Sequence, residues 1–163
     1  MNIGKKMEKA INDQIQAELY SGYMYLAMAA YFEAQNLKGC AHWMKKQAEE
    51  EQEHAMKFFD YVAERGGRVT LQAIQAPKTD WASPLAAFED AYAHEQKVTS
   101  LIYGLYEVAL KEKDYTSQTF LQWYLTEQVE EEADSSEIVE KLKAVQGAPQ
   151  GLLMLDRELG QRG

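Results

Sequence analysis

The sequence GGRVTLQAIQAPKTDWA at residues 66–82 separates two long helical patterns and has no helical pattern of its own. An extended chain of this length reaches up to ~55 Å. The helix expected before it, of about 27 residues, is ~40 Å long. The segment can therefore run the full length of a helical bundle, which would leave the helices before and after it parallel. Val69, Leu71 and Ile74 alternate with polar residues, as expected of a chain that lies on the bundle surface.

Four long helical patterns surround this crossover, two before it and two after it. We expect these helices at about 5–35, 39–65, 84–113 and 114–146. Ser83 and Pro84 form a typical helix start, and Asp114 is a good cap for the last long helix. The other two links are short, so each joins an antiparallel hairpin. The predicted fold is all-α: one domain over residues 1–163 containing an up-down-down-up four-helix bundle with one long crossover.

A short apolar stretch, GLLMLDREL at residues 151–159, follows the bundle. It predicts a fifth helix at about 149–160. A helix of two to three turns is marginal alone, so its leucines need a surface on their own bundle or on neighbouring subunits.

The charge of the chain excludes several classes of partner. It has 26 acidic and 17 basic residues, a formal net charge of −9. This balance argues against nucleic acid and against an anionic membrane surface. No segment reaches the ~20 apolar residues of a membrane span and the N-terminus lacks a signal-peptide pattern, so we expect a cytoplasmic protein. The single cysteine excludes an intrachain disulfide and a multi-cysteine metal site.

Every long helix carries an acidic residue in the middle of its apolar stripe. These residues are Glu18, Glu51, Glu95 and Glu131, and His54 lies one helical turn after Glu51. Burying four carboxylates together is very unfavourable unless cations or protons neutralise them. Oxygen ligands with a minority of imidazole suit iron or manganese. The pattern therefore predicts a metal site in the bundle centre, where Glu51 bridges two ions through its two oxygens.

The residues alone leave alternatives open. Tyr25, seven residues after Glu18, is either a hydrogen-bonding or electron-donating partner of the site or a core tyrosine. Trp123 is either a redox residue or a packing residue. One rival function is a di-iron oxidase acting on an organic substrate, which needs an apolar pocket beside the metals. A second rival is a structural bundle without metal, which would leave the four carboxylates without a partner.

Four stretches resemble the non-haem ferritins of bacteria and archaea: AELYS at 17–21, EEQEHA at 50–55, FLQWY at 120–124 and EQVEEE at 127–132. The resemblance covers nearly the whole chain. It implies a ferritin-like fold and a ferroxidase that oxidises ferrous iron with dioxygen or hydrogen peroxide. It also implies storage of the ferric product in a hollow homo-oligomeric shell, usually of twenty-four subunits.

The resemblance further implies a di-iron ferroxidase centre with a third iron position nearby. The positions that match the ligands of the first iron are Glu18, Glu51 and His54. Those that match the second iron are Glu51, Glu95 and Glu131, with Gln128 and Tyr25 beside them. Those that match the third iron are Glu50, Glu127, Glu130 and Glu131.

Several residues of this chain differ from the patterns of related di-iron families, and these differences favour a non-haem ferritin over those families. This chain has a Glu-x-x-His pattern only on its second long helix, whereas the general di-iron pattern has it on two. Gln52 stands where bacterioferritin places a haem-ligating methionine, so we expect no haem. Rubrerythrin has an additional iron domain with four cysteines, which a chain with a single cysteine cannot form. The miniature DNA-protecting ferritins place their ligands at a subunit interface and lack the short last helix.

Overall fold

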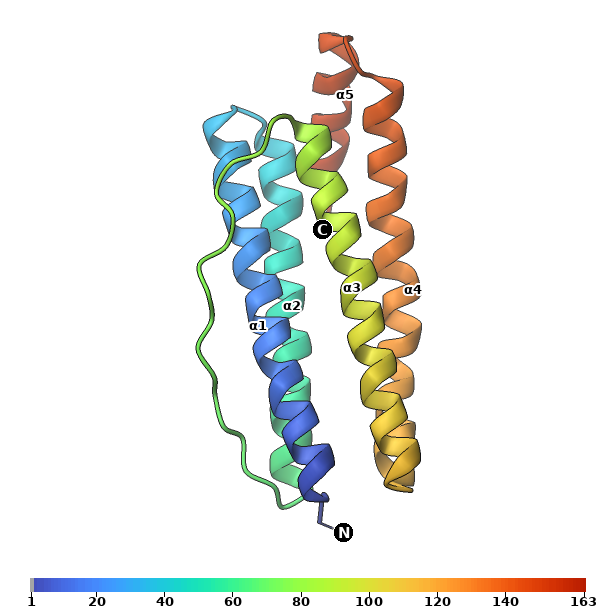
Figure 1. The fold of residues 1–163 in the computed structure, drawn as a ribbon. Helices are drawn as coiled ribbons and strands as arrows, with labels where there is room; N and C mark the ends of the chain where they lie inside the picture. Colours follow the sequence, from blue (N-terminus) through green and yellow to red (C-terminus); the bar gives the residue numbers. More distant parts are fainter. Residues whose placement is uncertain (1) are drawn as a thin grey trace.

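The computed structural model describes residues 2–163 and, within them, contains helices and no strand. The helices are α1 (Lys5–Ala34), α2 (Lys38–Glu64), α3 (Pro84–Lys111), α4 (Tyr115–Ala144) and α5 (Pro149–Leu159). Figure 1 shows α1 and α4 running in one direction and α2 and α3 in the other, with α5 at one end. The predicted up-down-down-up bundle with a short last helix is confirmed. Among the described residues, no helix combines the length and apolar character needed to cross a membrane.

The helix ends form for the local reasons that the sequence indicates. The side chain of Ser83 accepts a hydrogen bond from the backbone N–H of Ala86, and that of Asp114 accepts one from the N–H of Ser117. Gly66 follows α2 with a φ of 71°, a left-handed conformation that glycine adopts without strain. The observed helix bounds lie within two residues of the predicted ones.

The crossover lies along α1 for the length of the bundle (Figure 1). Polar side chains of α1 hold it there. Asn12 Nδ2 donates to the carbonyl oxygen of Arg68 at 3.0 Å, and the N–H of Thr70 donates to Asn12 Oδ1 at 2.8 Å. Its apolar residues contribute less than the alternation suggests, because Leu71 and Ile74 are 66% and 40% exposed. Hydrogen bonds therefore fix the middle of this segment, while Val69 and Trp81 pack against the two core clusters.

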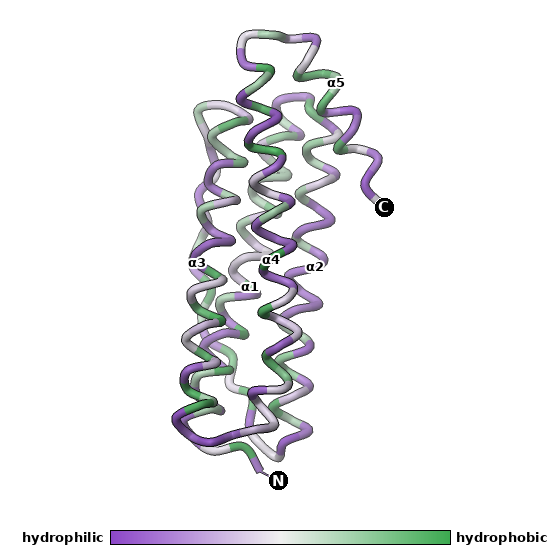
Figure 2. The backbone as a smooth tube through the Cα atoms, turned by 90° about the vertical axis from the view of Figure 1, so that its right-hand side faces the viewer, coloured by the Kyte–Doolittle hydropathy of each residue, from purple (hydrophilic) through white to green (hydrophobic). Residues whose placement is uncertain are grey.

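The bundle core consists of two apolar clusters separated by a polar layer. One cluster, toward α5, includes Met28, Phe32, Trp43, Phe88 and Leu142. The other, toward the opposite end, includes Ile11, Phe58, Ile102, Leu121 and Tyr124. Hydrophobic and hydrophilic residues alternate along every long helix in Figure 2, as amphipathic helices require. The buried polar residues between the clusters are Gln14, Glu18, Gln47, Glu51, His54, Glu95, Thr99, Gln128, Glu131 and Ser135.

The three-and-four spacing of apolar residues predicts which face of each helix points inward, and this prediction is confirmed for α1 and α2 and partly wrong for α4. On α4 the spacing predicts that Phe120 and Glu127 point inward, but both are only half-buried. Leu121 and Gln128, one residue further along, are buried instead. Phe120 packs against the core from its half-buried position and stacks on Tyr61, with ring centres 3.8 Å apart. Polar residues on the buried face of α4 concealed this shift from a reading of hydrophobicity.

Helix α5 packs its leucines on its own bundle. Leu155 and Leu159 are buried, whereas Leu153 and Met154 stay exposed. The backbone of α5 approaches the start of α2 so closely that a Cβ on Gly39 would lie 1.6 Å from the carbonyl oxygen of Asp156. Only glycine fits at this position without moving α5.

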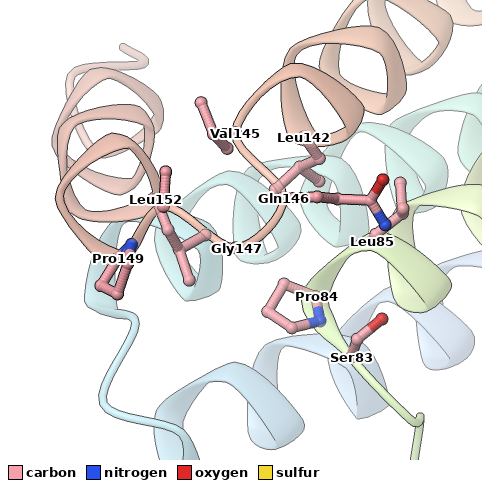
Figure 3. A pocket seen from close by; sticks show the side chains of 10 residues that line it. Ser83, Pro84, Leu85, Leu142, Val145, Gln146, Gly147, Pro149 and Leu152 are labelled. Carbon is pink, nitrogen blue, oxygen red and sulfur yellow. The ribbon is translucent and has the colours of Figure 1, made fainter.

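An apolar cavity of about 420 Å³ opens at the same end of the molecule. Figure 3 shows Pro84 and Leu85 of α3, Leu142 of α4 and Leu152 of α5 around it. None of the buried acidic residues of the polar layer lines this cavity.

Phe58→Ala should destabilise the metal-free protein by about 3–5 kcal/mol, because a buried aromatic side chain leaves a cavity. Phe58 is fully buried and stacks on Tyr124 with ring centres 4.0 Å apart. Val129→Ala, at a position that is 70% exposed, should cost less than about 0.5 kcal/mol. Denaturant unfolding followed by circular dichroism measures both values, and equal losses in the two variants would contradict the described core.

Candidate metal centre

Each of the four long helices contributes an acidic side chain to the polar layer. The side chains of Glu18 (α1), Glu51 (α2), Glu95 (α3) and Glu131 (α4) are all buried. Ligand atoms of Glu18, Glu51 and His54 lie within 4.8 Å of one another, and so do those of Glu51, Glu95 and Glu131. The residues expected to hold two metal ions therefore form two adjacent groups that share Glu51.

His54 presents its Nδ1 atom to the first of these groups. Nδ1 lies 3.4 Å from Glu51 Oε2 and 4.0 Å from Glu18 Oε2. Ligand atoms around one ion, with bonds of about 2 Å, are separated by roughly 3–4 Å. Tyr124 fixes the backbone beside the ring, because its hydroxyl donates to the carbonyl oxygen of His54 at 2.7 Å.

Neutral donors orient the carboxylates from outside the layer. Glu18 and Glu131 each accept one hydrogen bond on one oxygen, which leaves the other oxygen available, whereas Glu95 accepts one on each oxygen. The donor–acceptor pairs are Gln14 Nε2 to Glu18 Oε1 at 3.0 Å, Tyr25 Oη to Glu95 Oε1 at 2.7 Å, Gln47 Nε2 to Glu131 Oε2 at 2.8 Å and Gln128 Nε2 to Glu95 Oε2 at 3.3 Å.

Burial makes negative charge unfavourable at this cluster. Burial and the neighbouring Glu18 raise the pKa of Glu51 well above its usual value. Burial also raises the pKa of Glu95 to about 7, although the hydrogen bond from Tyr25 lowers it. Burial and the charge of Glu95 raise the pKa of Glu131 to about 9. In the absence of a cation, these carboxyl groups retain protons at pH values where exposed carboxyl groups have lost them.

The donor set fits hard divalent or trivalent cations. Glu18 Oε2 is buried and has no hydrogen-bond partner, and it faces the Nδ1 atom of His54. Among the described residues, no lysine or arginine forms an ion pair with the four carboxylates of the cluster. Buried charge of this kind requires a partner. Several carboxylate oxygens with one imidazole nitrogen suit iron or manganese better than softer metals.

Comparison with known proteins identifies the family. The family model described as the ferritin-like domain matches residues 8–145. The chain belongs to the ferritin family. It is 44% identical to a bacterial non-heme ferritin of Bacteroides fragilis over 160 residues, which cover 98% of this chain and 99% of that protein. It is 38% identical to a bacterial non-heme ferritin of Staphylococcus aureus, over 98% of this chain and 96% of the relative.

Solved ferritin structures match the fold closely. The structure of an open-pore ferritin from the hyperthermophilic archaeon Archaeoglobus fulgidus superposes with a TM-score of 0.98 and 53% identity, covering 99% of this chain and 100% of that one. The resemblance to bacterial and archaeal ferritins and the expected function in iron storage are therefore confirmed. The likeness to ferritin structures also supports a homo-oligomeric assembly.

The third metal position expected for a ferritin is only partly assembled. Glu127 and Glu131 lie in one group with His54, within 4.8 Å of one another. Glu50 instead accepts a hydrogen bond from Arg162 at 2.9 Å, and Glu130 is exposed. The assignment of metal ligands at all three positions of this ferritin stays a prediction.

Sequence reasoning missed three supporting residues of this ferritin. Gln14 lies one turn before Glu18, so its contact was predictable from helical spacing. Tyr124 belongs to the FLQWY motif, but its bond to the His54 backbone depends on how α2 and α4 pair. Arg162 lies at the chain end, where no pattern in the sequence indicates a contact with the bundle.

Zn²⁺ does not change oxidation state, so it reports binding alone. It should stabilise the wild-type ferritin about twice as much as it stabilises the Glu18→Gln variant. Each ion at about 100 times its Kd adds about 2.7 kcal/mol. Glu18 lies in one ligand group, whereas Glu51 lies in both. Glu51→Gln should therefore lose most of the Zn²⁺ stabilisation. Denaturant unfolding with and without Zn²⁺ tests this order, with the exposed neighbour Glu49→Gln as a control; equal stabilisation of Glu51→Gln and wild type would contradict a shared bridge.

The metal-free ferritin should lose stability as pH rises from about 5 to 9. The folded-state pKa values of Glu95 and Glu131 exceed the unfolded values, so the folded protein binds more protons across this range. The contribution of these two carboxyl groups to folding stability is therefore fully present below about pH 4.5. It is lost as pH rises through about 7 for Glu95 and about 9 for Glu131. Glu131→Gln should flatten the upper part of the profile, because the group with the pKa of about 9 is removed. Denaturant midpoints measured from pH 5 to 9 test this. The same loss of stability with pH in the variant and the wild type would contradict the prediction.

Proposed function

We propose that this protein oxidises ferrous iron at the buried carboxylate cluster and stores the ferric product inside a homo-oligomeric shell. Iron storage is the function of its family, and the proposal adds that this chain itself carries out the ferroxidase step. The observation that carries it is the partnerless buried oxygen of Glu18 beside two adjacent ligand groups. The storage shell is expected to contain twenty-four subunits and to work in the cytoplasm.

Each residue of the cluster has a distinct part in this proposal. Glu18 and His54 hold one ferrous ion, Glu95 and Glu131 hold the other, and Glu51 bridges the two. Tyr25 stays protonated because burial and the charge of Glu95 raise its pKa well above the usual value. It therefore acts as a fixed hydrogen-bond donor that orients Glu95, as Gln128 does from the other side.

The proposed reaction transfers electrons from the substrate iron to dioxygen or hydrogen peroxide. Two ferrous ions lose one electron each, and dioxygen with two protons accepts both electrons to become hydrogen peroxide. With hydrogen peroxide as the oxidant, the two electrons break its O–O bond and give two hydroxide ions. Anionic oxygen ligands favour the ferric state because they stabilise the higher charge. Glu50, Glu127 and Glu130 would receive an ion on the path from the site into the shell.

A charged cavity beside the site disfavours the rival function of an organic-substrate oxidase. The cavity of about 240 Å³ that reaches His54 is lined by Glu50, Glu53, Lys57, Trp123 and Glu127. Trp123 is 40% exposed there and carries the Lys57 ammonium 3.6 Å from a ring centre. An apolar substrate would not displace water from such a surface. The larger apolar cavity in Figure 3 is lined by none of the proposed ligands.

The deciding experiment adds ferrous iron aerobically to the metal-free shell while recording ferric absorbance and particle size. We expect a rapid phase of about two irons per subunit, one for each ligand group, followed by retention of many more irons in a large particle. His54→Ala should slow the rapid phase by at least about tenfold, because even outer partners of metal ligands cost 10–100-fold.

Glu49→Gln is the matched control, because this exposed acid on α2 pairs with Lys46 and lines a different surface. It should oxidise iron as the wild type does. Oxidation that stops at two irons in a small oligomer would overturn the storage part of the proposal. An unchanged rapid phase in His54→Ala would overturn the site.

A further inference from the structure

The end of the chain folds back onto the metal centre. Arg162 lies just beyond α5, and its guanidinium reaches α2. Nη2 donates to Gln47 Oε1 at 2.7 Å and to Glu50 Oε1 at 2.9 Å, and Nη1 donates to the carbonyl oxygen of Trp43 at 3.2 Å. The carbonyl oxygen of Arg162 itself accepts a hydrogen bond from His42 Nε2 at 2.6 Å.

The guanidinium also packs on the ring of Trp43, with its central carbon 4.7 Å from the ring centre. Its side chain is 20% exposed. A planar guanidinium with several fixed donors can stack and form these hydrogen bonds at once, which an ammonium cannot do. The guanidinium is thus held in one geometry by contacts with three side chains and a backbone group of α2.

One of these contacts determines the orientation of Gln47. Because Arg162 donates to Oε1, the amide nitrogen of Gln47 must face the other way, and it donates to Glu131 Oε2 at 2.8 Å. A reversed amide would place its oxygen against the carboxylate oxygen. The hydrogen bond to one oxygen of Glu131 leaves the second oxygen for the ion shared with Glu51 and Glu95.

A second contact occupies Glu50. This residue lines the cavity beside His54 and Glu127, where the third ion is expected. A cation that takes the other oxygen of Glu50 as a ligand would lie close to the guanidinium, and the positive charge of Arg162 would oppose its binding. The guanidinium therefore already supplies positive charge at this edge of the acidic cluster.

We propose that Arg162 is a positioning residue with two effects on metal binding: it orients Gln47 toward Glu131, and its charge disfavours a third ion at Glu50. This inference rests on the proposed function of the cluster and adds to it. The chain end thereby strengthens binding of the second ion and weakens binding of the third.

Titration of the metal-free shell with Zn²⁺ by calorimetry tests both effects without iron oxidation. The wild type should bind two ions per subunit tightly. Arg162→Gln should bind a third ion and bind the second about tenfold more weakly, because an outer partner of Glu131 has lost its orientation. Arg162→Lys keeps a charge near Glu50 but loses the fork, so it should bind two ions with the second again weakened.

Two controls separate this effect from a structural one. Arg157→Gln removes an exposed charge from α5 and should bind Zn²⁺ as the wild type does. The double variant Arg162→Gln with Glu50→Gln should lose the third ion. Hydrogen exchange of α5 checks that the helix stays docked. Buried Leu155 and the hydrogen bond from the backbone N–H of Cys40 to Asp156 Oδ1 hold it in place. If α5 undocks in Arg162→Gln, the lysine variant alone decides.

Several outcomes would overturn the inference. They are three tight ions in the wild type, unchanged binding of the second ion in both Arg162 variants, or a third ion that persists in the double variant. A wild type that binds no Zn²⁺ would overturn the proposed function of the cluster as well. A wild type with two ions and unaffected variants would overturn only the role of Arg162.

Discussion

The fold is organised around the cost of burying four carboxylates in one layer. Glu18, Glu51, Glu95 and Glu131 lie between two apolar clusters, where water is excluded and charge is unfavourable. The raised pKa values of Glu51, Glu95 and Glu131 show how unfavourable that charge is. The apolar clusters on either side supply the packing that keeps the helices together despite this cost. Protons or cations must offset the charge of such a layer, and the proposed metal site would supply the cations.

The donors around the layer determine which oxygens are free. Gln14, Tyr25 and Gln47 each donate to one oxygen of a different carboxylate, so the cluster is oriented without being neutralised. His54 is the only imidazole in the two groups that share Glu51, which makes the two proposed metal positions unequal. The position with the imidazole has the softer ligand set, and the other consists of carboxylates alone.

The link between α5 and the metal centre gives the last helix a part beyond covering the end of the bundle. Gly39 allows α5 to approach α2 closely, and Leu155 and Leu159 dock it. The chain then returns to place Arg162 against Gln47 and Glu50. Because the second of these contacts involves a residue expected to bind the third ion, the proposed role of Arg162 would couple the position of α5 to metal binding.

The sequence by itself determined the helices, their directions and the acidic residue on each. Helical spacing placed Glu18 and Glu51 on buried faces, and the crossover was long enough to leave α2 and α3 parallel. On α4 the same spacing predicted Phe120 and Glu127 on the inward face, whereas Leu121 and Gln128, one residue further along, are the buried ones. Only the tertiary structure decided the rotation of α4, the partner of Glu50 and the return of Arg162 to α2. The reason is that periodicity reports contacts within one helix, whereas these contacts join residues from different helices, whose relative rotation and spacing are set by packing.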